Sequence, residues 1–126
     1  MGRLWICAGA ANGFIAVALG ALASHSLDGL APEARNWIEI GTRYELVHAL
    51  ALLAVALMAR REVKPSVFVS VAGWAFLLGT VLFSGVLYAM ALAGMSRLSA
   101  LVPLGGVAFL IGWATLFFYG LSPRSR

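Results

Sequence analysis

Four long stretches without a charged residue limit what this chain can fold into more than any other feature. They cover residues 4–27, 46–59, 65–96 and 98–123. A helix needs ~20 apolar residues to cross the ~30 Å hydrocarbon core of a bilayer, so three of the stretches are long enough as they stand. The second has only 14 residues. We therefore expect its crossing to begin upstream, near Ile38 or Ile40, with Arg43 and Glu45 in the headgroup region.

The composition excludes a soluble globular domain. Hydrophobic residues make up 62% of the 126-residue chain and charged residues 11%, with a mean hydropathy of +0.94, against ~45–50% and ~25% in ordinary soluble domains. A core of this size cannot bury so much apolar surface, so lipid must surround the chain. The sequence predicts one all-α domain, residues 1–126, that forms an integral membrane bundle of four transmembrane helices over about residues 4–26, 40–60, 66–93 and 99–121.

The basic residues predict how the bundle is oriented. With four spans, one side of the membrane carries six of them, namely Arg3, Arg60, Arg61, Lys64, Arg124 and Arg126. The other side carries Arg35, Arg43 and Arg97. Because short basic segments stay on the cytoplasmic side, we expect both termini in the cytoplasm and the protein in the cell (inner) membrane. The net charge of +4 is then a topology signal, and we expect no nucleic-acid partner.

The segment between the first two spans has an amphipathic pattern. Asp28 and Gly29 indicate a turn, and Pro32 suits the first position of a helix. Trp37 and Tyr44 lie on one face of that helix, at the spacing of an apolar stripe. The sequence predicts an interfacial helix here, leading into the second span. A partner-binding surface is the alternative.

Small residues follow helical spacing in the first span, where they predict a face for close helix packing. They are Gly9, Gly13, Ala16, Gly20 and Ser24. Further glycines in the third and fourth spans are Gly73, Gly79, Gly85, Gly94, Gly105, Gly106 and Gly112. For these the alternative is that membrane helices are simply rich in glycine.

Polar residues inside the spans are candidates for a functional site, because unneeded polarity in hydrocarbon is expensive. They are His25, Arg43, Tyr44, His48, Ser84 and Tyr88. In the proposed topology they gather toward the non-cytoplasmic side, and Thr80, Ser84 and Tyr88 share a helix face. Glu45, three residues before His48, is placed to tune the proton affinity of that imidazole.

Three interpretations of these polar residues remain open. The first is a hydrogen-bonded cluster that fixes helix register. The second is a site for a small solute or a proton, for which His and Tyr are suitable donors and acceptors. The third is a metal or haem site at His25 and His48. It is the weakest, because no Cys or carboxylate stands at a recognised ligand spacing; we expect no metal and no cofactor.

Several short segments, spread over nearly the whole chain, match one family in order. They are residues 19–25 (LGALASH), 43–52 (RYELVHALAL), 83–88 (FSGVLY), 103–106 (PLGG) and 112–113 (GW). They resemble the segments G-A-x-G-A-H, R-Y-x-x-x-H-A-L-A-L, F-S-G-S-x-Y, P-x-G-G and G-W of the small bacterial membrane proteins of family DUF423, which is related to a eukaryotic family of small transmembrane proteins. The resemblance implies a multi-span membrane protein. It implies no activity, because the biochemistry of the family is not established.

No motif of soluble catalytic chemistry is present in the sequence. A phosphate-binding loop, a nucleophile elbow, a dinucleotide fingerprint and an HExxH motif are all missing. We therefore expect a non-enzymatic protein with a structural or accessory role, which associates with itself or with another membrane protein. The alternative is a pathway for a small solute or a proton through the polar His and Tyr residues.

Overall fold

The computed structural model describes residues 1–25, 28–64 and 66–123, and within them every regular element is helical. In chain order the elements are α1 (Gly2–His25), α2 (Pro32–Arg61), α3 (Val67–Gly79), the π-helix η1 (Thr80–Gly85), α4 (Val86–Ala93), the 3₁₀-helix η2 (Ser96–Leu101) and α5 (Val102–Leu121). Four helical runs among the described residues are long and apolar enough to span a membrane: Gly2–His25, Pro32–Arg61, Val67–Ala93 and Ser96–Leu121. The predicted all-α bundle of four transmembrane helices is confirmed.

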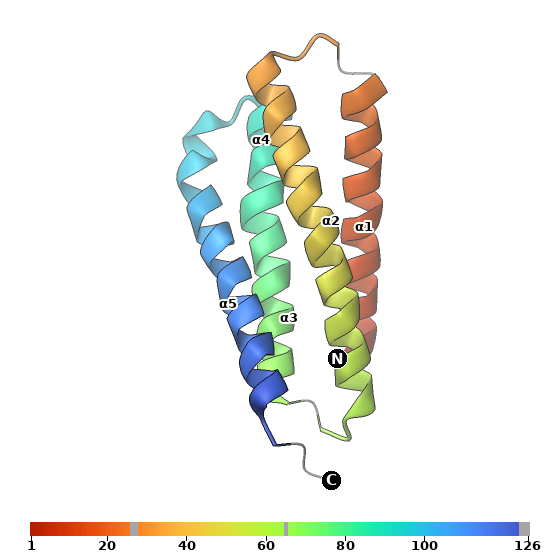
Figure 1. Ribbon diagram of the computed structural model, residues 1–126. Helices are drawn as coiled ribbons and strands as arrows, with labels where there is room; N and C mark the ends of the chain where they lie inside the picture. The colour runs from red at the N-terminus through yellow and green to blue at the C-terminus, as the bar shows by residue number, and fades with distance from the viewer. Residues whose placement is uncertain (26–27, 65, 124–126) are drawn as a thin grey trace.

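The helices run antiparallel to their neighbours in the chain (Figure 1). α2 and the continuous α3, η1 and α4 run form the middle of the bundle. α1 packs mainly along α2, and α5 packs along α3 and η1. α1 and α5 are therefore the flanking helices, and most of their surface faces away from the rest of the chain.

The interfacial helix expected before the second span is not a separate element. α2 begins at Pro32, as predicted, and continues without a break to Arg61. Its first turns are held against the bundle by a small hydrophobic cluster in which Ala34 and Ile38 of α2 contact Ala23 of α1 and Ala91 of α4. Because this packing continues directly into the second span, nothing separates the amphipathic segment from the rest of the helix.

The third span is not the uniform α-helix that its apolar sequence predicts. The hydroxyl of Ser66 accepts a hydrogen bond from the Phe68 amide (3.2 Å) and caps the start of α3. The wider η1 turn then separates α3 from α4, and Gly94 ends α4 in the left-handed region at φ 66°. π-turns inside α-helices often occur at functional sites, and this one faces α2 and α5.

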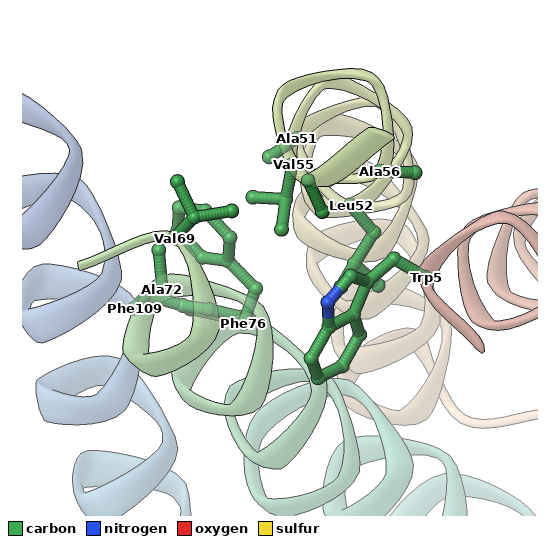
Figure 2. Packing of buried hydrophobic residues seen from close by; sticks show 10 residues of the cluster. Trp5, Ala51, Leu52, Val55, Ala56, Val69, Ala72, Phe76 and Phe109 are labelled. Atoms are coloured by element: carbon green, nitrogen blue, oxygen red, sulfur yellow. The ribbon is translucent and has the colours of Figure 1, made fainter. Parts of the chain in front are cut away.

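The largest hydrophobic cluster lies toward the end of the bundle that holds both termini. Figure 2 shows the Trp5 indole of α1 reaching between α2 and α3, next to Leu52 and Val55. Gly73 on α3 makes room for this ring, since a Cβ there would lie 2.5 Å from Trp5 Cε2. Among the described residues, Trp5 Nε1 is the one buried side-chain polar atom without a hydrogen-bond partner.

A carboxylate ties two helix ends together on the same side of the bundle. Glu62, directly after α2, accepts a hydrogen bond from the Tyr119 hydroxyl of α5 (2.6 Å) and one from the Ser66 amide (2.6 Å). These bonds join the C-terminal end of α5 to the α2–α3 connection.

Candidate functional site

Two helices meet at a buried carboxyl near the middle of α2. The hydroxyl of Tyr88 on α4 donates a hydrogen bond to Oε2 of Glu45 on α2. Both side chains are buried, with 4% of Glu45 and 9% of Tyr88 exposed. Gly41, one turn before Glu45, leaves space for the Tyr88 ring, because a Cβ at Gly41 would lie 2.7 Å from its Cε1.

The π-helix adds a second link to α2 at the same level. Ser84 is fully buried, and its hydroxyl donates to the backbone carbonyl of Gly41 at 2.7 Å. One turn earlier, the hydroxyl of the buried Thr80 donates to the Leu77 carbonyl of its own helix at 2.8 Å. Ser84 and Tyr88 therefore bind α2 one turn apart, at Gly41 and Glu45 respectively.

His48 joins α2 to α5. Its Nδ1 lies 2.6 Å from the backbone carbonyl oxygen of Tyr44, and its Nε2 lies 3.0 Å from the indole Nε1 of Trp113 on α5. A carbonyl oxygen only accepts and an indole N–H only donates. The imidazole is therefore neutral, with its proton on Nδ1. The ring also stacks on Phe109 of α5, with centroids 3.6 Å apart and planes 9° apart.

Tyr44 contributes through its backbone and ring rather than as a polar group of the interior. Its side chain is 44% exposed. Its ring lies against Phe83 of η1, with centroids 4.6 Å apart, and stacks more distantly on Phe109. Tyr44 and His48 lie one turn apart on α2, and the hydrogen bond between them uses the Tyr44 carbonyl.

Two of the residues expected in the cluster lie outside it. His25 is exposed at the last turn of α1. Its neighbour Ala23 is the residue of that turn that points inward, and two residues further on a helix places a side chain about 200° around the axis. Arg43 is also exposed, and lies on the α1 side of α2.

Glu45 corrects one further expectation. It is buried between helices near the middle of α2, which begins at Pro32, and its expected position in the headgroup region stays a prediction. It was also expected to act on His48; instead Glu45 binds Tyr88, and His48 binds Trp113.

The two histidines do not form a shared site. His48 lies in the middle of α2 with both ring nitrogens engaged, and His25 lies at the exposed end of α1. In the described part of the chain, no three His, Cys, Asp or Glu side chains are grouped closely enough to hold a metal ion. His25 and His48 therefore cannot act together as the two ligands that the metal or haem interpretation needs.

The predicted packing glycines fall into three groups. A Cβ at Gly9 would lie 2.9 Å from the Ala49 carbonyl oxygen of α2, one at Gly105 would lie 2.5 Å from the Phe83 amide nitrogen, and one at Gly112 would lie 2.4 Å from Phe76 Cε1. Gly13 and Gly85 have ordinary van der Waals contacts only, and Gly20 and Gly106 face open space. The last two are corrections: they share the sequence pattern but make no close contact with a neighbouring helix.

Three important residues of the site were not predicted from the sequence as site residues. Gly41, Phe109 and Trp113 supply the space, the stacking surface and the hydrogen-bond donor described above. Trp113 lies within the G-W segment that carried the family resemblance, which was the available signal. Gly41 and Phe109 have no such signal, since they are ordinary residues of apolar helices.

Comparison with known proteins places this site within a family. The sequence profile described as "Protein of unknown function (DUF423)" matches residues 19–106. The chain belongs to the DUF423 family. The match includes Glu45, His48, Ser84 and Tyr88, whereas Trp113 lies beyond it.

Curated DUF423 relatives are similar over nearly their whole length. A UPF0382 membrane protein of Haemophilus influenzae is 41% identical over 117 residues, which cover 92% of each chain. YwdK, a UPF0382 membrane protein of Bacillus subtilis, is 40% identical over 88% of this chain and 90% of its own. The UPF0382 inner membrane protein YgdD of Escherichia coli K12 is 38% identical over 90% of this chain and 86% of its own. No solved structure matches. The DUF423 chain is thus an integral membrane protein of an uncharacterised family.

Proposed function

We propose that this DUF423 protein is a non-enzymatic structural or accessory component of a membrane assembly. The observation that supports the proposal is that the polar side chains of the bundle interior bind other groups of the same chain. Glu45 binds Tyr88, Ser84 binds the Gly41 carbonyl, and His48 binds at both ring nitrogens. Such bonds fix the register of α2 against α4 and α5, which is the usual work of polar residues between membrane helices.

A proton or solute pathway would need these bonds to open. A proton can enter or leave the imidazole of His48 at Nε2 only after Trp113 gives up its hydrogen bond, and at Nδ1 only after the Tyr44 carbonyl does. The ring is also held face to face on Phe109. The hydrogen bonds and the stacking together favour a fixed side chain over one that reorients to pass protons.

The first part of the strip of small residues on α1 is occupied by packing within the chain. Its Gly9 and Ala16 are buried, and Gly9 packs on the Ala49 carbonyl of α2. The proposal places a second protein against the outward faces of the flanking helices. Large apolar side chains are exposed there, including Phe14 on α1 (77%) and Phe117 on α5 (64%).

Photocrosslinking in native membranes tests the proposal. A photoreactive phenylalanine analogue replaces Phe14 or Phe117, and the same analogue at Phe76, which is fully buried, serves as the control. The proposal expects a discrete adduct of higher mass from at least one outward position and none from position 76. Recovery of monomer alone from both outward positions would count against it.

A second candidate function rests on the carboxyl of Glu45. An ionisable group inside a membrane bundle is expensive and often marks an ion or proton path. Among the residues that the structure describes, no basic side chain forms a salt bridge with Glu45. This candidate expects a proton flux in liposomes that the Glu45→Gln variant loses while the folded state survives.

A further inference from the structure

A polar groove lies between α1 and α2, outside the cluster around Glu45. It has a volume of about 410 Å³, within the ~300–1,000 Å³ range of small-molecule sites. The groove is lined by Ala16, Val17, Gly20, Ala23 and Ser24 of α1 and by Arg35, Glu39, Thr42, Arg43 and Leu46 of α2. The lining residues extend from Ser24 and Arg35, near the ends of α1 and α2 at their connection, to Ala16 and Leu46 further along the two helices.

The small residues of α1 create this groove. Gly9 brings the two helices into close contact nearer the termini, but a Cβ at Gly20 would meet no atom within 4 Å. The regular spacing of small residues therefore has two structural consequences along one helix. The N-terminal part of α1 packs on α2, and the C-terminal part of α1 borders the groove beside α2.

Two of the three charged residues in the lining are arginines. Arg35 and Arg43 lie two turns apart on α2, with Glu39 between them. Arg35 forms a salt bridge with Asp28 (3.1 Å). Arg43 forms no salt bridge or side-chain hydrogen bond with the residues that the structure describes, and it does not pair with Glu39 one turn away. Its guanidinium is therefore available to a ligand in the groove.

Polar and apolar groups are separated along the groove. Arg35 and Ser24 are near the helix ends at the α1–α2 connection, whereas Val17 and Leu46 lie further into the span. Because helical side chains tilt toward the helix N-terminus, Arg43 points toward the α1–α2 connection too. A ligand that fits both parts has an anionic head and an apolar tail, and a guanidinium is a strong donor to phosphate oxygens.

We propose that this groove binds one anionic phospholipid, with its phosphate at Arg43 and an acyl chain along Val17 and Leu46. This lipid-binding site is independent of the proposed role of the protein in a membrane assembly. Attraction of anionic lipid to the basic residues in general would not distinguish Arg43 from other arginines.

Lipid binding to the full chain in a zwitterionic detergent tests the proposal, measured by native mass spectrometry and by the midpoint of thermal unfolding. The probes are phosphatidylglycerol, phosphatidylcholine with the same acyl chains, and inorganic phosphate. We expect phosphatidylglycerol to bind more tightly and to raise the midpoint more than phosphatidylcholine. Arg43→Gln should weaken phosphatidylglycerol binding by roughly tenfold, the value of one charge-assisted hydrogen bond.

Two further variants keep the test decisive. Arg97→Gln removes the same charge from an exposed position in η2, outside the groove, and should leave binding unchanged. Gly20→Leu places a side chain in the open space of the groove; it should abolish binding without lowering the midpoint measured free of lipid. Equal losses in the Arg43 and Arg97 variants, or unchanged binding in Gly20→Leu, would overturn the site. Equal stabilisation by inorganic phosphate would overturn its assignment to a lipid.

Discussion

The hydroxyl of Tyr88 is the hydrogen-bond partner that the fold supplies to the buried carboxyl of Glu45. Removing it in Tyr88→Phe keeps the ring that fills the space beside Gly41 but leaves a buried acceptor without that donor. We expect the free energy of unfolding to fall by about 1–2 kcal/mol, measured by thermal or denaturant unfolding in detergent.

The matched control is Tyr44→Phe. Tyr44 is 44% exposed, and its hydroxyl has no hydrogen-bond partner among the described residues. This variant should change the free energy of unfolding by less than ~0.5 kcal/mol. Equal effects of the two substitutions would contradict the assignment of a stabilising role to the Tyr88 bond.

The protonation state of His48 gives a second prediction at the residue scale. Its partners, a carbonyl at Nδ1 and an indole N–H at Nε2, require a neutral ring with the proton on Nδ1. Nitrogen NMR of protein labelled at histidine should show this tautomer near neutral pH, and His25→Gln would leave a single histidine signal. An imidazolium, or a ring protonated on Nε2, would disagree with the structure.

Single residues were predictable from the sequence in a specific way. His48, Ser84 and Tyr88 stand out because they are polar within apolar spans, and the structure buries all three. Their partners were not predictable, because Tyr88 and Glu45 are 43 residues apart and His48 and Trp113 are 65 apart. Those pairings depend on how each helix is rotated, which hydropathy does not specify.

Close packing between helices depends on individual glycines, and two adjacent ones in α5 give a matched test. A Cβ at Gly105 would press on backbone atoms of η1, at 2.5 Å from the Phe83 nitrogen, whereas Gly106 faces open space. Gly105→Ala should destabilise the protein by about 1–3 kcal/mol through overpacking. Gly106→Ala should be neutral or stabilising by up to ~1 kcal/mol, since Gly weakens a helix. Unfolding in detergent checks both variants, and the reverse order would show that α5 is rotated differently.

At the element scale, the sequence predicted the positions of the helices better than the helix types within them. Length and hydropathy predict the four membrane runs because a bilayer has a fixed thickness. The η1 turn had no signal, because its residues, Thr80 to Gly85, also suit an α-helix. The interfacial helix expected after Pro32 is not confirmed as a separate element, because tertiary contacts of Ala34 and Ile38 with α1 and α4 hold this segment in one helix with the second span.

For the whole molecule, the distribution of basic residues gives a prediction about topology. The ends of α1 and α5 that carry the termini share one side of the bundle with the Arg60 and Arg61 end of α2. We expect that side to face the cytoplasm. A fluorescent protein fused after Arg126 should therefore fluoresce, and alkaline phosphatase at the same position should be inactive; a reporter fused in the α1–α2 connection should behave in the opposite way. Active phosphatase at the C-terminus would show that the protein has the opposite orientation.

The most direct test of a structural role for the buried polar cluster is proton flux into liposomes that contain the purified protein, measured with a pH-sensitive dye alongside unfolding of the same samples. If the side chains of Glu45, Tyr88 and His48 hold α2, α4 and α5 together, liposomes with the wild-type protein should conduct protons no faster than protein-free liposomes. The Tyr88→Phe variant should also have a lower unfolding midpoint. A flux that Glu45→Gln abolishes, with the unfolding midpoint unchanged, would contradict the structural role and establish a pathway.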